Sequence, residues 1–199
     1  MSHSYINALK GRRSQYALGK NLPLPRQDVT ALIQEAIRLA PSAFNSQSSR
    51  AVILYGAQSE KFWNIVKEAL RKIVPGDAFA ATETKIDGFT AGAGTILFYE
   101  DQDVIAGLQK QFAAYADNFP IWSEQASGMA QFSVWTALAS AGIGASLQHY
   151  NPLPDAAAAA EWRLPASWKL RAQMPFGANN GGFRDKTFIA DEQRFRVFA

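Results

Sequence analysis

The sequence contains no cysteine, and its only histidines are His3 and His149. Without thiols the chain has no disulfide bonds, no thiolate metal ligands and no cysteine nucleophile, and two histidines argue against a multi-histidine metal site. No apolar run reaches the length of a transmembrane helix. The first residues, Met1 to Tyr5, lack the basic and apolar regions of a signal peptide. We therefore expect a soluble cytoplasmic protein that does not enter a membrane.

The chain also carries little net charge. Its 20 lysines and arginines exceed its 17 aspartates and glutamates by three, and they are scattered along the sequence, although the isoelectric point is near 9.2. This balance does not indicate a nucleic-acid partner, but it suits a small anionic ligand. Apolar residues make up 48% of the 199 residues, which is enough for a sizeable core. With no internal repeat and no linker, we expect one domain over residues 1–199.

Apolar periodicity and helix-breaking residues predict alternating helices and strands. The acidic run 100–103 is interpreted as the start of a helix rather than a metal cluster, because carboxylates favour a helix N-terminus. Residues 168–176 alternate as a half-exposed strand would, and residues 177–182 are expected to form a flexible loop. The other predicted helices cover residues 5–10, 27–40, 78–88 and 155–162, together with a segment that Ser59 caps and Pro75 ends. The other predicted strands cover residues 50–55, 95–99 and 145–150. A close bend at 92–94 is expected before the strand 95–99.

A long helix predicted from about Ser123 to Ala141 is apolar on more than one face. Such a helix has to be buried nearly all round, which places it either at the centre of the domain or in a subunit interface. The last residues, through Phe195, Val197 and Phe198, are apolar as well. A terminus of this kind usually docks, so we expect the tail to have a partner surface.

One polar loop stands out between a helix and a strand, Pro41 to Arg50. Pro41 stops the preceding helix, and the strand begins at Ala51. The neutral polar side chains of this loop offer both donors and acceptors, which could grip the edge of an uncharged, heteroatom-rich ligand. An ordinary polar connection is the alternative. The side chains concerned are Ser42, Asn45, Ser46, Gln47, Ser48 and Ser49.

Two short cationic motifs lie near the two ends of the chain. Arg12, Arg13 and Ser14 follow the first helix, and two guanidiniums with a hydroxyl can hold a phosphate. A second cationic pair, Arg184 and Lys186, follows the glycine-rich stretch near the C-terminus. Solvated surface charge is the alternative interpretation of both. For His149, a hydrogen-bonded structural role is likewise the alternative to a catalytic one.

Taken in order, these features resemble the FMN-dependent nitroreductase family. The ordered set consists of Arg12-Arg13-Ser14, Pro41-Ser42-Ala43-Phe44-Asn45-Ser46-Gln47 and the late basic pair. The most similar subgroup is the short one that includes the fungal fatty-acid-repression-mutant proteins, on the stretches 42–50 and 94–100. The resemblance spans residues 5–198. It implies an α+β fold, a mostly antiparallel sheet wrapped by helices, in a homodimer with FMN at the interface and a C-terminal extension exchanged between subunits.

The resemblance also assigns a phosphate site. Arg12, Arg13 and Ser14 match the family's first phosphate and ribityl contacts. Arg184 and Lys186 match the basic pair that closes on the same phosphate. Many members have this pair in the order Lys-x-Arg, whereas this chain has Arg-x-Lys, which preserves charge and changes which position can bind in a bidentate manner.

Further matches surround the flavin ring. Lys85 corresponds to a lysine near the N1 and O2 edge, and Gln148 and His149 fall at the strand end that faces N5. Many relatives carry Glu-Gly there, where this chain has His149-Tyr150. The loop that reaches the flavin from the other subunit corresponds to Pro41, Ser42, Asn45 and Gln47.

The implied activity is an oxidoreductase whose hydride chemistry belongs to FMN. NADH or NADPH would reduce the flavin, and a nitroaromatic or quinone would then be reduced in ping-pong fashion. No protein nucleophile is needed, and Lys85 and His149 are candidate helpers. Three alternatives stay open: a flavin-binding sensor or storage protein with little turnover, a phosphate-binding structural or interaction protein that merely shares the fold, and a flavin-fragmenting enzyme.

Overall fold

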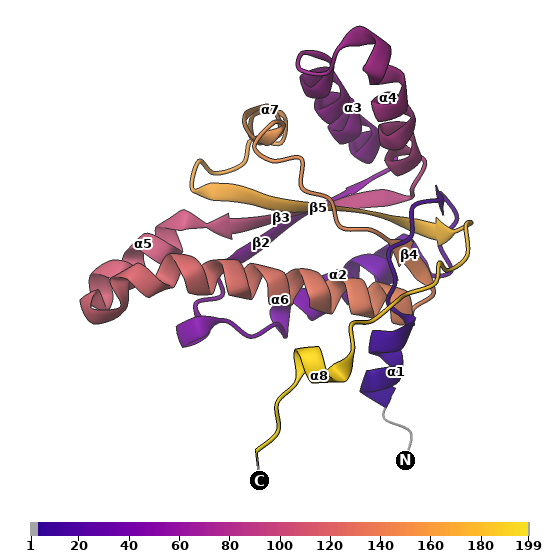
Figure 1. Cartoon of the computed structure of the whole chain (residues 1–199). Helices are drawn as coiled ribbons and strands as arrows, with labels where there is room; N and C mark the ends of the chain where they lie inside the picture. Colours follow the sequence, from indigo (N-terminus) through magenta and orange to yellow (C-terminus); the bar gives the residue numbers. More distant parts are fainter. Residues whose placement is uncertain (1–3, 199) are drawn as a thin grey trace.

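The computed structural model describes residues 4–198, so His3 lies outside the described part. Its centre is one sheet of five strands: β1 (Leu18–Gly19), β2 (Ser49–Tyr55), β3 (Gly94–Asp101), β4 (Ile143–Ala145) and β5 (Trp168–Asn179). The strands follow the order β1-β5-β3-β2, with β4 also paired to β5, and every pairing between them is antiparallel. The predicted fold class, α+β with a mostly antiparallel sheet wrapped by helices, is confirmed (Figure 1).

Helices cover both faces of the sheet (Figure 1). They are α1 (Ser4–Gly11), α2 (Arg26–Arg38), α3 (Ala57–Arg71), α4 (Gly76–Thr90), α5 (Gln102–Gln111), α6 (Phe119–Ser140), α7 (Asp155–Glu161) and α8 (Asp191–Arg194), with short 3₁₀ turns η1 (Ala43–Asn45) and η2 (Ala113–Asn118). No helix within residues 4–198 is both long and apolar enough to cross a membrane.

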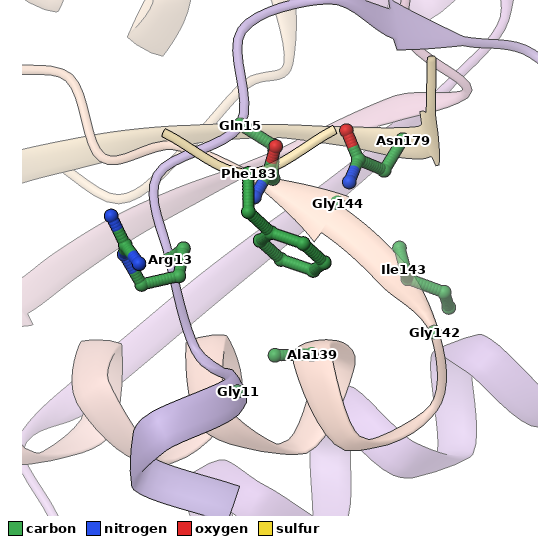
Figure 2. Close-up of a pocket in the computed structure, with 9 residues that line it drawn as sticks. All are labelled: Gly11, Arg13, Gln15, Ala139, Gly142, Ile143, Gly144, Asn179 and Phe183. Atoms are coloured by element: carbon green, nitrogen blue, oxygen red, sulfur yellow. The ribbon is translucent and has the colours of Figure 1, made fainter. Parts of the chain in front are cut away.

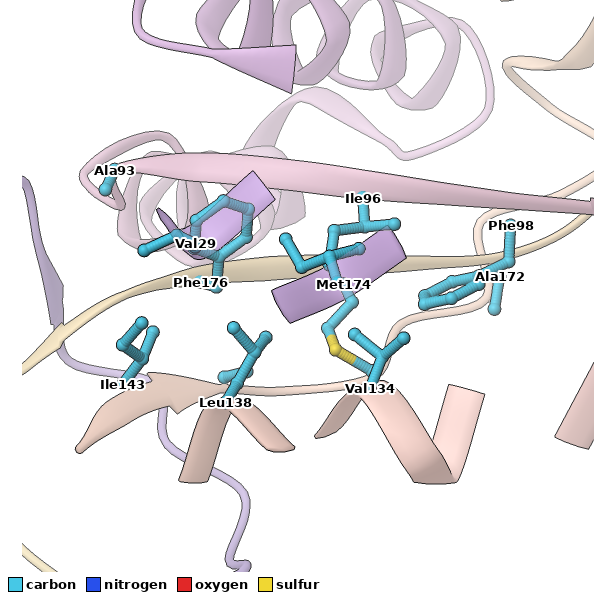
Figure 3. Packing of buried hydrophobic residues seen from close by; sticks show 12 residues of the cluster. Val29, Ala93, Ile96, Phe98, Val134, Leu138, Ile143, Ala172, Met174 and Phe176 are labelled. Carbon is cyan, nitrogen blue, oxygen red and sulfur yellow. The ribbon is translucent and has the colours of Figure 1, made fainter. Parts of the chain in front are cut away.

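Two hydrophobic cores result from this layering. On one face, α2 and α6 pack against the sheet, with Val29, Val134, Met174 and Phe176 among the buried residues (Figure 3). On the other face, α3, α4 and α7 enclose a second core around Trp63 and its neighbours. Both faces of the central strands are therefore shielded from water.

The strand β5 differs from its prediction. Residues 172–177 are all buried, so the expectation of a half-exposed strand is wrong. Alternating polarity usually indicates a strand with one solvent-exposed face. Here, however, the polar residue Gln173 is fully buried. Its side-chain amide accepts a hydrogen bond from the Tyr150 N–H at 2.7 Å and donates one to Asn151 at 3.2 Å. The expected flexible loop at 177–182 is also wrong in its first part, because β1 pairs with β5 up to Asn179 and β4 pairs with it up to Ala178.

Three local predictions also need correction. Ser59 does not cap α3 but lies inside it, where its hydroxyl shares a 2.7 Å hydrogen bond with Thr95. Glu100 lies inside strand β3, one residue before its end, instead of starting a helix, and α5 begins after Asp101, whose carboxylate caps it. The strand expected at 145–150 is the short β4 followed by a single bridge between Gln148 and Gln173.

The long helix α6 occupies the centre of the molecule and also has an uncovered apolar side. Val134 and Leu138 are fully buried, whereas Met129 is 38% and Phe132 40% exposed. The tail beyond β5 is apolar and exposed as well, with Phe198 at 91%. Part of the apolar surface of residues 4–198 therefore remains exposed to solvent.

Candidate functional site

The segment Arg12–Ser14 is held against β4. Ser14 forms a bridge with Ala145, and the Gln15 N–H donates to the Ala145 carbonyl at 2.9 Å. The Arg12 guanidinium lies 4.3 Å from the centroid of the Trp135 ring, a cation–π contact. Burial and the charge of Arg13 both lower the pKa of Arg12 from its ordinary value.

Trp135 connects this segment to the sheet a second time, because its indole N–H donates to the Ala145 carbonyl at 3.2 Å. The indole therefore supports Arg12 with its ring face and β4 with its nitrogen. Sequence analysis placed Trp135 in the apolar helix and assigned it no functional role. The contact joins residues far apart in sequence, so no local pattern could have shown it.

The C-terminal segment returns to the same place. Arg13 donates to the Arg184 carbonyl, and the Arg184 guanidinium lies 5.8 Å from the centroid of the Tyr16 ring. Lys186 makes its described contact farther along the tail, 5.0 Å from the centroid of the Phe188 ring. The structure thus brings Arg184 to Arg13 and leaves Lys186 on the tail. A cavity of about 120 Å³ lies between the two segments, lined by Ser14, Gln15, Tyr16, Ala17, Gly181, Gly182 and Arg184.

A smaller cavity of about 60 Å³ lies beside the first (Figure 2). The Phe183 ring lies within it, between the amides of Gln15 and Asn179 and the α6 residue Ala139. Gln15 is only 4% exposed, and its amide nitrogen has no hydrogen-bond partner among the described residues. Sequence analysis did not single out Gln15, since nothing in its local pattern distinguishes it.

Lys85, Gln148 and His149 lie near one another around Tyr150. The Lys85 ammonium is 6.0 Å from the centroid of the Tyr150 ring. His149 is exposed, whereas Gln148 is buried and its amide donates to the Ser146 hydroxyl at 3.1 Å. Gln148 and His149 follow Ala145, the β4 residue that contacts Ser14 and Gln15, by three and four residues in the chain. The structure therefore brings Arg13 and Arg184 into contact and places Lys85 beside Tyr150.

The polar loop 41–50 is tightly folded on itself. Asn45 donates from its backbone to the Ser42 carbonyl at 3.0 Å, and the Gln47 N–H donates to the Ser42 hydroxyl at 3.0 Å. Phe44, Asn45 and Gln47 all have positive φ, at 55°, 49° and 47°. Non-glycine residues seldom adopt this region and concentrate at functional sites.

The loop does not present all its hydroxyls to a ligand. Ser48 and Ser49 donate to the buried Glu100 carboxylate, so the expectation that they grip a ligand is wrong. Pro41, Asn45 and Gln47 remain exposed. A cavity of about 200 Å³ lies between this loop and the α2 end, lined by Ile37, Arg38, Ala40, Pro41, Ser42, Gln47, Ser49, Arg50 and Ala126.

An aromatic cluster holds the loop tip. Phe44 stacks on Trp122 at 5.9 Å between centroids, and its ring is also 4.8 Å from Phe112 and 5.3 Å from Phe119. Tyr115 completes the cluster and is 48% exposed. Sequence analysis missed this cluster, because its members come from η1, the end of α5, η2 and α6.

The loop and the cationic group lie at opposite ends of α6. Phe44 contacts Trp122, and Arg12 contacts Trp135. Thirteen residues at 1.5 Å per residue separate these two tryptophans along the helix by roughly 20 Å. The helix therefore holds the two groups well apart within one chain. Within residues 4–198 there is also no group of three acidic or histidine side chains that could hold a metal ion.

This architecture, an antiparallel sheet between helical layers with separate cationic and polar-loop groups, is the nitroreductase fold. The nitroreductase family model matches residues 9–178, and the chain belongs to this family. Nitroreductase FRM2 of Saccharomyces cerevisiae is 33% identical over 188 residues, covering 94% of this chain and 93% of that protein. HBN1 of the same yeast is 35% identical over 191 residues, 95% of each chain. The predicted resemblance to the fatty-acid-repression-mutant subgroup is confirmed.

A solved structure is more similar still. Nitroreductase CinD from Lactococcus lactis, in complex with chloramphenicol, matches with a TM-score of 0.91 at 50% identity and covers 98% of this chain and 100% of its own. The same enzyme in complex with 4-nitrophenol matches with a TM-score of 0.90 at 52% identity.

Proposed function

We propose that this protein is an FMN-dependent oxidoreductase that uses NADH or NADPH to reduce nitroaromatic or quinone acceptors. The observation that carries the proposal is the meeting of the two cationic segments from opposite ends of the chain, where Arg13, next to Arg12, donates to the Arg184 carbonyl. Among residues 4–198, none of the three forms an ion pair with a carboxylate within 4 Å. Their charge is therefore available to an anion.

The residues fit FMN in two respects. The cationic group with the Ser14 hydroxyl suits a phosphate, because guanidinium–phosphate bonds are charge-assisted. The neutral donors and acceptors of Asn45 and Gln47 suit the polar edge of a flavin ring. Solved nitroreductases from Desulfovibrio desulfuricans and Desulfitobacterium hafniense hold FMN, and at 17% identity they support only the fold's capacity for it.

The separation of the two groups supports a shared site in a homodimer. Because roughly 20 Å of α6 lies between them in one chain, the loop of one subunit would complete the cationic group of the other. The uncovered apolar side of α6 and the apolar tail provide surface for such an assembly. Exchange of the C-terminal extension between subunits is part of this proposal.

FMN, when bound, accepts hydride from the nicotinamide and passes it to the acceptor. In this chain, Arg12, Arg13 and Arg184 bind the phosphate, with Lys186 joining them if the tail closes. Lys85 would supply positive charge that stabilises the reduced flavin. Pro41, Ser42, Asn45 and Gln47 of the partner subunit would help to hold the flavin, and Gln148 and His149 would contribute to the substrate side of the site.

The choice of substrates rests on the CinD structures. They contain chloramphenicol and 4-nitrophenol, both nitroaromatic compounds, and nicotinic acid, which shares its ring with the nicotinamide of NADH. At 50–52% identity, these are informative guides for this chain. Quinones are proposed on chemical grounds, since they also accept hydride.

The absorption spectrum of the purified protein tests the proposal. We expect flavin bands, as purified or after adding FMN, that bleach with NADH or NADPH without oxygen and return with 4-nitrophenol. Flavin bands that neither nucleotide bleaches would instead indicate a sensor or storage protein. A protein that stays colourless with added FMN would refute the flavin proposal.

A further inference from the structure

Glu100 is a buried carboxylate held by three hydroxyls from two other elements. It is the last but one residue of strand β3 and is only 1% exposed. Ser48 donates to it at 2.6 Å, Ser123 donates at 2.8 Å, and Ser49 donates to its other oxygen. Ser48 and Ser49 belong to the polar loop 41–50, and Ser123 belongs to α6. One side chain thus joins the sheet, the loop and the long helix.

No cation neutralises this carboxylate. Among residues 4–198, the ion pairs within 4 Å do not include Glu100. A buried charge is costly unless it is hydrogen-bonded, and replacing a buried ionic group with apolar residues is often neutral or stabilising. Stability alone therefore gives little reason for a carboxylate here. All three hydroxyls donate to the two oxygens of this side chain, which fixes the direction in which they point.

Arg50 and Asp101, which follow Ser49 and Glu100 in the sequence, hold the same loop through a second set of contacts. Arg50 donates to the Asp101 carboxylate at 3.1 Å and to the Gln47 carbonyl at 2.6 Å. In addition, the Asp101 N–H donates to the Ser48 carbonyl at 3.0 Å. The end of β3 therefore holds the C-terminal half of the loop through both side chains and backbone.

The loop needs such support, because three of its residues have positive φ. Such a conformation is unfavourable for a non-glycine residue and persists only where surrounding contacts determine it. Phe44 is held by the aromatic cluster at the tip. Asn45 and Gln47, which lie between the tip and Ser48, depend on how the stem is anchored.

We propose that Glu100 is a positioning residue that orients the loop so that Ser42, Asn45 and Gln47 meet the flavin of the partner subunit. This inference rests on the proposed function. It assigns to Glu100 an effect on the flavin site through Ser48 and Ser49, without contact with the flavin itself.

The test compares Glu100→Gln and the loop-side double variant Ser48→Ala/Ser49→Ala with the helix-side control Ser123→Ala. The control removes one hydrogen bond to the same carboxylate and leaves both loop contacts in place. Three properties are measured: the dissociation constant for FMN, the visible circular dichroism of bound FMN, and hydrogen exchange of the Asn45 and Gln47 amides without flavin.

We expect Glu100→Gln and the double variant to weaken FMN binding about tenfold, equivalent to about 1.4 kcal/mol, to change the visible circular dichroism and to speed exchange in the loop. Ser123→Ala should lower the melting temperature and leave all three properties close to wild type. If Glu100→Gln does not fold, the double variant alone decides the question.

The proposal is overturned if the loop-side variants only lower the melting temperature, or if Ser123→Ala disturbs the flavin signal as much as they do. A wild-type protein that binds no FMN would refute the proposed function, and loop exchange would then still show whether Glu100 positions the loop.

Discussion

At the scale of single residues, the candidate site depends on groups supported by aromatic rings rather than by carboxylates. Arg12 rests on Trp135 and Arg184 on Tyr16. A ring face supports a guanidinium without neutralising its charge. A carboxylate partner would instead neutralise the charge that attracts an anionic ligand. The cationic group is therefore positioned and still available.

Replacing Arg12 with Ala should weaken FMN binding by about 1.5–3 kcal/mol, the range for a hydrogen bond to a charged group. Isothermal titration with FMN measures the loss. Arg26→Ala is the matched control, because Arg26 makes the same type of contact with Tyr55, at 4.8 Å, away from the cationic group. Equal affinities for wild type and Arg12→Ala would contradict the assigned role.

Asp155 should make stability depend on pH in an unusual direction. Burial raises the pKa of its carboxyl, and one of its oxygens is buried without a hydrogen-bond partner in the described chain. The folded state therefore holds this proton more tightly than the unfolded state. The stability from Asp155 is present below the unfolded pKa, near 3.9, and is lost as pH rises through the folded pKa.

Asp155→Asn removes this titration, so the variant should gain stability relative to wild type as pH rises above the unfolded pKa and through the folded pKa. Urea unfolding across that range measures the difference. Asp77→Asn is a suitable control, because Asp77 also lies in the first turn of a helix but is exposed. A constant difference between wild type and Asp155→Asn at all pH values would contradict the argument.

At the scale of elements, β5 organises the fold, because β1, β3 and β4 all pair with it. Gly177 lies where these strands converge. A Cβ at this position would be 2.2 Å from the Gly19 carbonyl oxygen and 2.9 Å from the Ala93 nitrogen. Both neighbours are backbone atoms of paired segments, so neither can move without breaking the sheet.

Gly177→Ala should therefore destabilise the protein by about 1–3 kcal/mol, as overpacking typically does. Gly107→Ala is the contrasting change, since Gly107 is exposed within α5 and an added Cβ meets nothing within 4 Å. It should stabilise the helix by roughly 0.5–1 kcal/mol. Chemical denaturation of both variants measures the two effects, and equal signs would contradict the explanation.

At the scale of the whole molecule, the uncovered apolar surface lies around α6 and the tail. Tyr5, Leu39 and Phe132 line a groove of about 270 Å³ between α1, α2 and α6. Leu39 is 71% exposed. Contiguous apolar surface of this kind marks interaction sites in soluble proteins, which agrees with the proposed homodimer.

Phe132→Glu should weaken the dimer by about 2 kcal/mol or more, as loss of a buried aromatic anchor does. FMN binding should fall with it, because each proposed site needs both subunits. Ile73→Glu is the control, since Ile73 is also apolar and exposed but follows α3 on the other face of the sheet. Sedimentation at several concentrations gives the assembly state. A Phe132→Glu dimer as stable as wild type would exclude this face from the interface.

Local pattern predicted much of this architecture. The apolar spacing of α2 and α6 predicted both helices. The close bend expected at 92–94 leads into β3, and a Cβ added to Gly94 would lie 2.5 Å from the Leu54 carbonyl oxygen. Predictions failed where burial came from distant elements. The pattern around Gln173 predicted a half-exposed strand, because the sequence does not show that helices cover both sides of β5. Glu100 was expected to begin a helix, because its three serine donors lie elsewhere in the chain.

The sequence by itself determined the fold class, the family and the residue types that suit an anionic, ring-shaped ligand. These follow from short-range chemistry: helix periodicity, proline breaks, and the order of cationic and polar motifs. Only the tertiary structure decided that Arg184 meets Arg13, that Ser48 and Ser49 turn inward to Glu100, and that the loop and the cations lie at opposite ends of α6. The physical reason is that these arrangements depend on contacts between residues far apart in the chain, which no local pattern encodes.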